Sequence, residues 1–226
     1  MVVFFAPSGP DARSMQVLRS EHAAGEEVCE VWYVPGVLSP GLRASAEHWL
    51  AGLSLCRGEA FGRPLARQQG WFHPSLRRFC PGWRQADHLR WKPHPYTALL
   101  QQLQAAVQAA VQELGIATCF SGCLVNHYVN GDDYIQLHRD EAYGPRTTVA
   151  GLSLGATRTM QWQAVPYNPD CPRSLKLQEP GARTVTCRLE PGSVLVMAGA
   201  TQKHWAHGIA PEPAVRDARF SLTFRE

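Results

Sequence analysis

The chain has 226 residues, of which 45% are hydrophobic and 18% are charged, and its formal net charge is +3. This length suits one substantial domain, and the near balance of charges excludes a polyelectrolyte tail or a disordered acidic segment. No run approaches the ~18 consecutive apolar residues of a membrane-spanning helix, so we expect no membrane partner.

The cysteines and the N-terminus indicate the compartment. Seven cysteines without CxxC spacing argue against a disulfide framework and a thiolate zinc site, and they favour a reducing compartment. The short apolar start, MVVFF, has no basic region ahead of it and does not resemble a secretory signal. We therefore expect an intracellular protein of the nucleus or the cytoplasm.

The first half of the chain predicts one strand and two helices. Residues 1–28 are polar and irregular, and we expect them to form a flexible leader. A strand is predicted at Glu30 to Val34, and a serine-proline pair at Ser39 then supplies the cap and first residue of a helix. The clearest helix runs from Tyr96 to Leu114, because apolar residues recur there every four positions.

After Gly115 the pattern changes to short β-rich runs separated by Gly, Pro, Asn or Asp. The runs are Cys123–Val129, Thr147–Leu154, Arg158–Ala164, Arg183–Leu189, Ser193–Ala198 and Ala218–Arg225. Strands without helical crossovers predict an antiparallel sandwich or jelly roll with helices packed outside. We expect an α+β, mainly β fold in a single domain over 29–226, with helical support over 29–118 and the jelly-roll core over 119–226.

His138-Arg139-Asp140 is the first motif with chemical content. In an extended chain residues two apart point the same way, so His138 and Asp140 share a face. A further histidine, His204 or His207, would complete the two-histidine, one-carboxylate set that leaves positions open on ferrous iron. The alternative is that the pair binds no metal and consists of an exposed histidine beside a solvated aspartate. A protein-kinase loop is excluded, because Pro145 stands where that loop needs asparagine and no DFG motif is present.

The run Arg219 to Arg225 alternates strictly between apolar and polar residues. Its three apolar side chains face a core, while Arg219, Ser221, Thr223 and Arg225 share the opposite face. Two buried arginines in a sheet need anionic partners, and the planar guanidinium suits a carboxylate. The alternative is an edge strand with both arginines in water.

Four motifs together resemble the AlkB family of iron(II)- and 2-oxoglutarate-dependent dioxygenases. They are Asn126-x-Tyr128, His138-x-Asp140, His207 in WAHGI, and Arg219 with Arg225 in RFSLTFR. They follow the family's order and spacing over roughly residues 120–226, and TVAGLSLGATRTMQW is similar to the family's strand-turn-strand. The resemblance implies a double-stranded β-helix, which agrees with the antiparallel strands predicted above.

The resemblance also implies roles and cofactors. The implied iron ligands are His138, Asp140 and His207. His207 is preferred to His204 because, in the family, a small and then an aliphatic residue follow the distal ligand, as Gly208 and Ile209 do here. The residues implied to bind 2-oxoglutarate are Asn126, Tyr128, Arg219, Thr223 and Arg225. The implied cofactors are Fe(2+), 2-oxoglutarate and O2, with ascorbate as the reductant in vitro.

Residues 57–92 contain eight basic residues against two acids, with aromatic residues interleaved. Such a segment suits phosphate neutralisation and the stacking of an exposed base. The alternative is an arginine-rich solvated surface with tryptophans in the core. More faintly, the segment resembles the nucleotide-recognition lid of the family's DNA-repair branch, in which an aromatic wedge on a hairpin enters the base stack.

The lid resemblance implies substrate contacts. The implied substrate-binding residues are Phe61, Gly62, Arg63, Arg67, Trp71, Trp91 and Glu141. A flipped base would stack on His138, and the candidates for the opposite wall are Trp71, Trp83, His88 and Trp91. The repair branch carries two consecutive acids after its HRD motif, whereas this chain has Glu141-Ala142 and so departs from the pattern at the second position.

The resemblance implies an enzyme that demethylates N-alkylated nucleobases in DNA, a direct reversal repair releasing formaldehyde, succinate and CO2. The expected partners are alkylated DNA and also RNA, and we expect a monomer. Three alternatives stay open: an RNA demethylase, a dioxygenase that hydroxylates a small molecule or a protein side chain, and a non-enzymatic nucleic-acid-binding protein with a degenerate metal site.

Overall fold

The computed structural model describes residues 14–22, 27–60, 63–79, 91–140, 147–167 and 184–226. Its helices are α1 (Pro40–Ala51), α2 (Ala98–Glu113) and the short α3 (Thr201–His204). Its strands are β1 (Met15–His22), β2 (Glu27–Val34), β3 (Cys56–Ala60), β4 (Arg63–Phe72), β5 (Pro93–His94), β6 (Gly122–Tyr128), β7 (Ile135–His138), β8 (Val149–Gly155), β9 (Arg158–Ala164), β10 (Thr184–Leu189), β11 (Val194–Gly199), β12 (Trp205–Ile209) and β13 (Arg219–Arg225).

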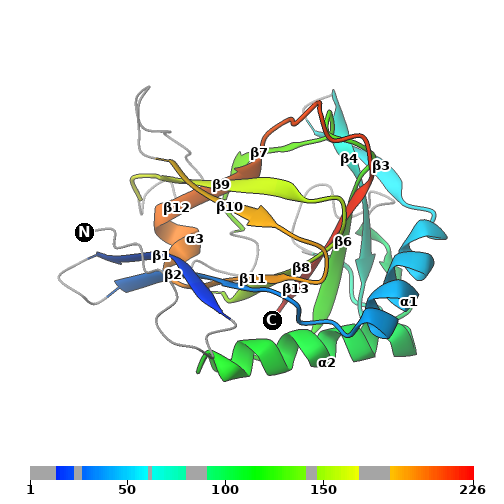
Figure 1. Cartoon of the computed structure of the whole chain (residues 1–226), viewed down its shortest axis with the longest axis horizontal. Helices are drawn as coiled ribbons and strands as arrows, with labels where there is room; N and C mark the ends of the chain where they lie inside the picture. The colour runs from blue at the N-terminus through cyan, green and yellow to red at the C-terminus, as the bar shows by residue number, and fades with distance from the viewer. Residues whose placement is uncertain (1–13, 23–26, 61–62, 80–90, 141–146, 168–183) are drawn as a thin grey trace.

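The strands form two sheets that face each other (Figure 1). The nine-stranded sheet has the order β1-β2-β11-β8-β13-β6-β4-β3, with β5 beside β4, and the four-stranded sheet has the order β10-β9-β12-β7. Every pairing is antiparallel except that of β4 with β5. This is the antiparallel sandwich that the sequence predicts.

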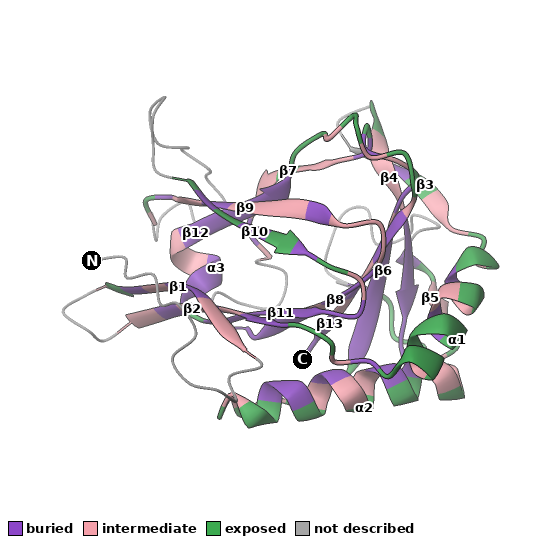
Figure 2. Cartoon of the chain, in the orientation of Figure 1, coloured by how far each residue is buried: buried purple, intermediate pink, exposed green. Residues whose placement is uncertain are grey.

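Two buried layers hold the sandwich together. Between the sheets, Trp162 and Leu189 of the smaller sheet share one cluster with Val149 and Met197 of the larger sheet. On the outer face of the larger sheet, α1 and α2 cover a second cluster, and α2 turns its buried stripe toward the strands (Figure 2). Each leucine or valine buried this way stabilises the fold by about 1.5–3 kcal/mol.

Both helices that the sequence predicts are present, each with a side-chain cap at its first turn. Ser39 caps α1 by accepting a hydrogen bond from the main-chain N–H of Leu42, and proline occupies the first helical turn. Thr97 caps α2 in the same way by accepting from Leu100. α2 is one to two residues shorter at each end than its predicted range.

β13 is an interior strand, which decides how its arginines are placed. It pairs with β6 on one side and β8 on the other, so that Arg219 lies opposite Tyr128 and Gly155. Arg219 and Arg225 are only 2% and 5% exposed. The alternative of an edge strand with both arginines in water is therefore wrong.

The flexible leader predicted for residues 1–28 is wrong for the part that the structure describes. Met15–His22 forms β1 and pairs along its length with β2, which itself begins at Glu27. Val17 and Leu18 are buried in the core between the sheets. The sequence pattern missed this strand because only a few of its residues are apolar. Residues 1–13 and 23–26 lie outside the described residues.

Among the described helices, none combines the length and the apolar character that crossing a bilayer requires.

Candidate metal centre and cosubstrate pocket

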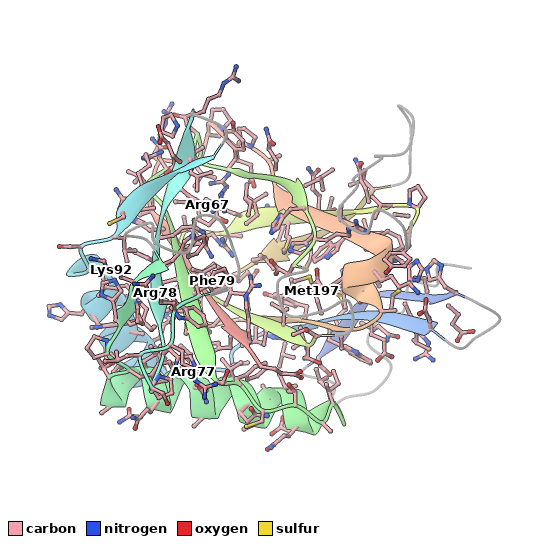
Figure 3. The ribbon with its side chains drawn as sticks, turned by 180° about the vertical axis from the view of Figure 1, so that it is seen from behind. Arg67, Arg77, Arg78, Phe79, Lys92 and Met197 are labelled. Atoms are coloured by element: carbon pink, nitrogen blue, oxygen red, sulfur yellow. The ribbon has the colours of Figure 1, made fainter. Side chains whose placement is uncertain are left out.

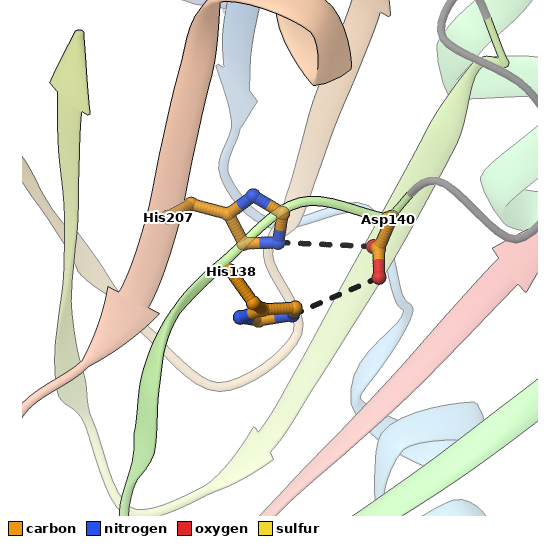
Figure 4. A group of neighbouring side chains, drawn as sticks. All are labelled: His138, Asp140 and His207. Carbon is orange, nitrogen blue, oxygen red and sulfur yellow. Dashed lines mark ion pairs between the residues drawn. The ribbon is translucent and has the colours of Figure 1, made fainter. Parts of the chain in front are cut away.

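Strand pairing brings together three side chains that are far apart in the sequence. β7 and β12 are antiparallel neighbours in which His138 lies opposite His207, and Asp140 follows two residues after β7. The potential ligand atoms of the three residues all lie within 4.8 Å of one another (Figure 4). Nε2 of His138 and Nε2 of His207 are each 3.7 Å from an oxygen of Asp140. The local register thus builds one facial set of two imidazoles and a carboxylate.

The surroundings favour the protonation states that a cation needs. Burial, and after it the neighbouring His138, lower the pKa of His207 to about 3. Burial also lowers the pKa of His138, so both imidazoles are neutral near pH 7. Burial alone would raise the pKa of Asp140, but Arg225 and the two histidines outweigh it and hold this pKa well below its usual value. Neutral imidazoles and an ionised carboxylate are the forms that bind metal.

A main-chain carbonyl orients one of the imidazoles. Nδ1 of His138 lies 2.9 Å from the carbonyl oxygen of Gln136, to which it donates when it carries the proton. That bond leaves the lone pair of Nε2 facing Asp140, as outer-shell carbonyls commonly do for histidine ligands.

The alternative histidine is engaged elsewhere. Nε2 of His204 lies 2.7 Å from a carboxylate oxygen of Glu27, which also accepts from Nζ of Lys203. The ring of His204 stacks on that of His22 with centroids 3.9 Å apart. His204 therefore belongs to an ion-pair cluster at the β1–β2 hairpin and is absent from the three-residue set.

A cavity of about 1050 Å³ contains the three-residue set and extends between the sheets. All the predicted 2-oxoglutarate residues line it: Asn126, Tyr128, Arg219, Thr223 and Arg225. Of the predicted substrate contacts, Arg63, Arg67 and Trp91 also line it. Phe61, Gly62 and Glu141, together with the stacking candidates Trp83 and His88, lie outside the described residues.

Arg219 is a buried cation with unused hydrogen-bonding capacity at two of its nitrogens. Its Nη2 donates to Oγ of Ser153 at 3.0 Å, and its guanidinium lies 5.2 Å from the ring centroid of Tyr128. Its Nε and Nη1 have no partner among the described residues. Arg158, whose guanidinium also lies near that ring, donates through all three nitrogens to Glu212 and to carbonyl oxygens. Because unpaired buried donors are costly, Arg219 marks the place for an anion.

A sequence model described as the 2OG-Fe(II) oxygenase superfamily matches residues 32–225. The chain belongs to this superfamily.

Curated relatives place the oxygenase near the AlkB proteins, in agreement with the motifs. It is 34% identical over 108 residues to human alpha-ketoglutarate-dependent dioxygenase alkB homolog 3, an alignment covering 47% of this chain and 36% of that protein. It is 28% identical over 138 residues to human DNA oxidative demethylase ALKBH2, covering 59% of this chain and 48% of that protein. The chain thus spans between about a third and a half of the length of these relatives.

Solved structures confirm the fold. The structure of OsALKBH1 aligns with a TM-score of 0.59 at 18% identity, over 87% of this chain and 97% of that one. The non-heme alpha ketoglutarate dependent epimerase SnoN aligns with a TM-score of 0.55 at 16% identity, over 86% and 77%. The mainly β jelly roll with outer helices is confirmed, and the lid is not.

The oxygenase family implies iron(II), 2-oxoglutarate and O2, and the residues present fit them. His138, His207 and Asp140 are the nitrogen and oxygen donors of a ferrous site that leaves positions open. The unpartnered donors of Arg219 suit a dicarboxylate. The assignment of each residue to iron or to 2-oxoglutarate stays a prediction.

Trp71 is not part of the oxygenase cavity. It is 2% exposed, and its Nε1 donates to the carbonyl oxygen of Arg77 at 2.8 Å. Its ring fills the space beside Gly122, where an added Cβ would lie 2.3 Å from it. Trp71 therefore supports the wall from behind, in a buried cluster with Phe79, Trp91 and Leu124.

Sequence reasoning missed Phe79 and Gln69. Phe79 lines the cavity and stacks on Trp91 with centroids 4.5 Å apart, and Figure 3 shows it beside the exposed Arg78 and Lys92. Gln69 donates to Oδ1 of Asn126 at 2.8 Å. The interleaving of aromatic and basic residues indicated residues 57–92 as a binding segment, but it did not show which of their side chains line the cavity.

Arg67 connects the two predicted residue sets. Its Nε donates at 3.1 Å to Oδ1 of Asn126, the same atom that Gln69 uses. Because Oδ1 is the only acceptor of that amide, the Nδ2 group of Asn126 is left to donate to a ligand. Arg67, predicted to bind substrate, thereby orients a residue predicted to bind 2-oxoglutarate.

Proposed function

We propose that the chain oxidatively demethylates N-alkylated nucleobases in DNA. The observation that carries the proposal is a single cavity with two kinds of wall. One wall holds the two histidines and the carboxylate, and beside it lies the arginine strand β13. The other holds the stacked pair Phe79 and Trp91, with exposed basic residues next to them in the sequence. The printed name of the ALKBH2 relatives, DNA oxidative demethylase, supports the same substrate class.

The residues divide the work as follows. His138, Asp140 and His207 would hold the iron, which with O2 and 2-oxoglutarate supplies the oxidation of a C–H bond. Arg219 would pair with the distal carboxylate of 2-oxoglutarate, because its free donors lie far along β13 from Asp140. Arg225, bonded to Asp140, would serve the end nearer the iron.

The chemistry balances without a general base. Bound iron would couple the decarboxylation of 2-oxoglutarate, which takes one oxygen atom of O2 into succinate and releases CO2, to insertion of the other oxygen atom into a C–H bond of the N-methyl group. The resulting N-hydroxymethyl group releases formaldehyde, and the nitrogen regains a proton or its lone pair. The protein contributes geometry and the exclusion of water, for which the apolar ring pair and the buried arginine wall are suited.

The test is turnover of methylated oligonucleotides in the presence of Fe(2+), ascorbate and 2-oxoglutarate. We expect succinate and formaldehyde in equal amounts, and we expect His138→Ala and Asp140→Ala to lose both products. His48→Ala, which changes an exposed histidine on α1, is the matched control and should remain active. Product formation that survives the loss of His138 and Asp140 would refute the assignment.

The substrate class is separated by comparing methylated single-stranded DNA, duplex DNA and RNA at one stated salt concentration. Preference for DNA supports the proposal, and preference for RNA supports the RNA demethylase. Turnover of none of them, with succinate released on a small molecule or a peptide, would favour the hydroxylase. Binding that does not weaken with salt would count against a phosphate-contacting surface.

A further inference from the structure

α3 lies between β11 and β12 in the chain, and its buried side chain Gln202 contacts the segment that carries Asp140. Gln202 is 1% exposed, and its Oε1 accepts a hydrogen bond from the main-chain N–H of Asp140 at 2.9 Å. Its Nε2 faces the sulfur of Met197 at 3.7 Å. The whole side chain is thus enclosed, and its acceptor is aimed at the residue that carries the carboxylate.

The hydrogen bond from the N–H of Asp140 to Gln202 takes the place of a bond between strands, because β7 ends at His138. The pairing of β7 with β12 reaches His138 opposite His207, and Asp140 lies beyond the end of β7. A second bond from the same helix holds the residue between them, because Nη1 of Arg139 donates to the carbonyl oxygen of Lys203 at 3.1 Å. The main chain of Asp140 is therefore held in place by α3, whereas the β7–β12 strand pairing holds both histidines.

α3 is itself anchored on the opposite side. Oγ1 of Thr201 accepts from the N–H of Glu30 at 3.0 Å and lies 2.6 Å from the carbonyl oxygen of Ala198. Nζ of Lys203 donates to Glu27 at 2.6 Å. The helix is thus fastened to β2 and β11, so a bond from it to Asp140 is made to a fixed body.

We propose that Gln202 is a positioning residue for Asp140, fixing its main chain while Arg225 fixes its carboxylate. The proposal rests on the proposed function in treating Asp140 as a metal ligand. Two independent constraints, one on the main chain and one on the carboxylate, preorganise the oxygen against His138 and His207. Without Gln202 the segment after β7 can shift relative to the histidines.

The experiment measures Mn²⁺ binding to the full chain by calorimetry, with no nucleic acid present. Gln202→Met removes the acceptor at similar volume, and we expect the Kd for Mn²⁺ to rise by about 10- to 100-fold, the usual effect of an outer-shell partner. Gln202→Glu restores an acceptor oxygen at the same place and should recover much of the affinity. Thr201→Val weakens the anchoring of α3 but keeps the acceptor, so it should lower the melting temperature and raise the Kd much less than Gln202→Met does.

Three outcomes would overturn the proposal. The first is a Kd for Gln202→Met equal to that of the unsubstituted protein. The second is an equal loss of affinity in Thr201→Val, which would mean that the helix matters only for stability. The third is failure of Gln202→Glu to bind better than Gln202→Met. Should Gln202→Met not fold, Gln202→Leu takes its place, because it also removes the acceptor from the N–H of Asp140, and a Kd equal to that of the unsubstituted protein would again overturn the proposal. If the unsubstituted protein and His138→Ala bind Mn²⁺ equally, the proposed metal site itself fails.

Discussion

Nη2 of Arg225 lies 2.9 Å from Oδ1 of Asp140, which joins the last residue of β13 to the carboxylate of the metal set. Both side chains are at most 10% exposed, so the pair is largely removed from water. Such a pair stabilises little relative to apolar residues, but breaking it leaves a buried charge. The contact therefore couples β13 to the segment that carries Asp140.

Arg225→Met should strongly destabilise the metal-free protein. Asp140 would keep its burial and lose its main charge partner, so we expect its pKa to rise and the free energy of unfolding to fall by about 3–5 kcal/mol. Urea denaturation at neutral pH measures the change. Arg188→Met, an exposed substitution on β10, is the control and should change little. Equal stability of the two variants would contradict the role given to the pair.

Arg219→Met should stabilise the protein without 2-oxoglutarate and abolish its response to that molecule. The substitution removes two unpartnered buried donors, at the loss of one bond to Ser153. Adding 2-oxoglutarate with Mn²⁺ should raise the melting temperature of the unsubstituted protein and leave that of the variant unchanged. A variant that still gains thermal stability with 2-oxoglutarate would show that the carboxylate binds elsewhere.

His207→Ala should lose metal binding, whereas His204→Ala should keep it. His207 lies in the three-residue set, while His204 pairs with Glu27. The second variant should instead be less stable, because the Glu27 cluster fastens α3 to the β1–β2 hairpin. Binding of Mn²⁺ and thermal denaturation separate the two effects, and the reverse pattern would assign the ligand to His204.

Trp71→Phe should reduce stability and leave substrate selection alone. Its hydrogen bond to the carbonyl oxygen of Arg77 disappears and a gap opens beside Gly122, which together cost on the order of 1–3 kcal/mol. Trp91→Phe changes a residue that lines the cavity and is the informative comparison, with the KM for a methylated oligonucleotide as its readout. A KM that rises more in Trp71→Phe than in Trp91→Phe would return Trp71 to the substrate set.

The turn after β4 should weaken in acid through His73. Nδ1 of His73 accepts from the main-chain N–H of Ser75 at 3.1 Å, and burial, followed by the charge of Arg77, lowers its pKa below 6.5. The unfolded chain then binds more protons than the native one as pH falls below 6.5, so stability is complete above that pH and declines beneath it. His73→Asn keeps an acceptor but does not titrate, so its stability should overtake that of the unsubstituted protein in acid. Parallel pH profiles of unfolding free energy in the two proteins would contradict this.

The alternation of residues predicts one wall of the site well. Strict alternation in Arg219 to Arg225 settles which side chains share a face, and the two-residue spacing of His138 and Asp140 does the same. Both patterns depend only on residue spacing within one strand, so they can be interpreted without knowing which strands lie beside it. The sandwich follows similarly from the turn-punctuated runs after Gly115.

Contacts set by the path of the chain in space could not be predicted. On β4, Arg67, Gln69 and Trp71 follow the same two-residue spacing, yet the cavity ends before Trp71. The sequence does not say where a cavity stops along a strand. Gln202 was missed for a similar reason, because its partner is 62 residues away and the connection through α3 carries no motif.

The position of β13 between β6 and β8 has a consequence for motion. Its main-chain amides are tied on both flanks, so their hydrogens should be among the slowest in the molecule to exchange with deuterated solvent. The cavity wall that carries Arg219 and Arg225 is therefore expected to be rigid. Any adjustment of the cavity to ligands of different shape should then occur at the edge of the sheet, where β3 pairs with β4 on one side only among the described strands.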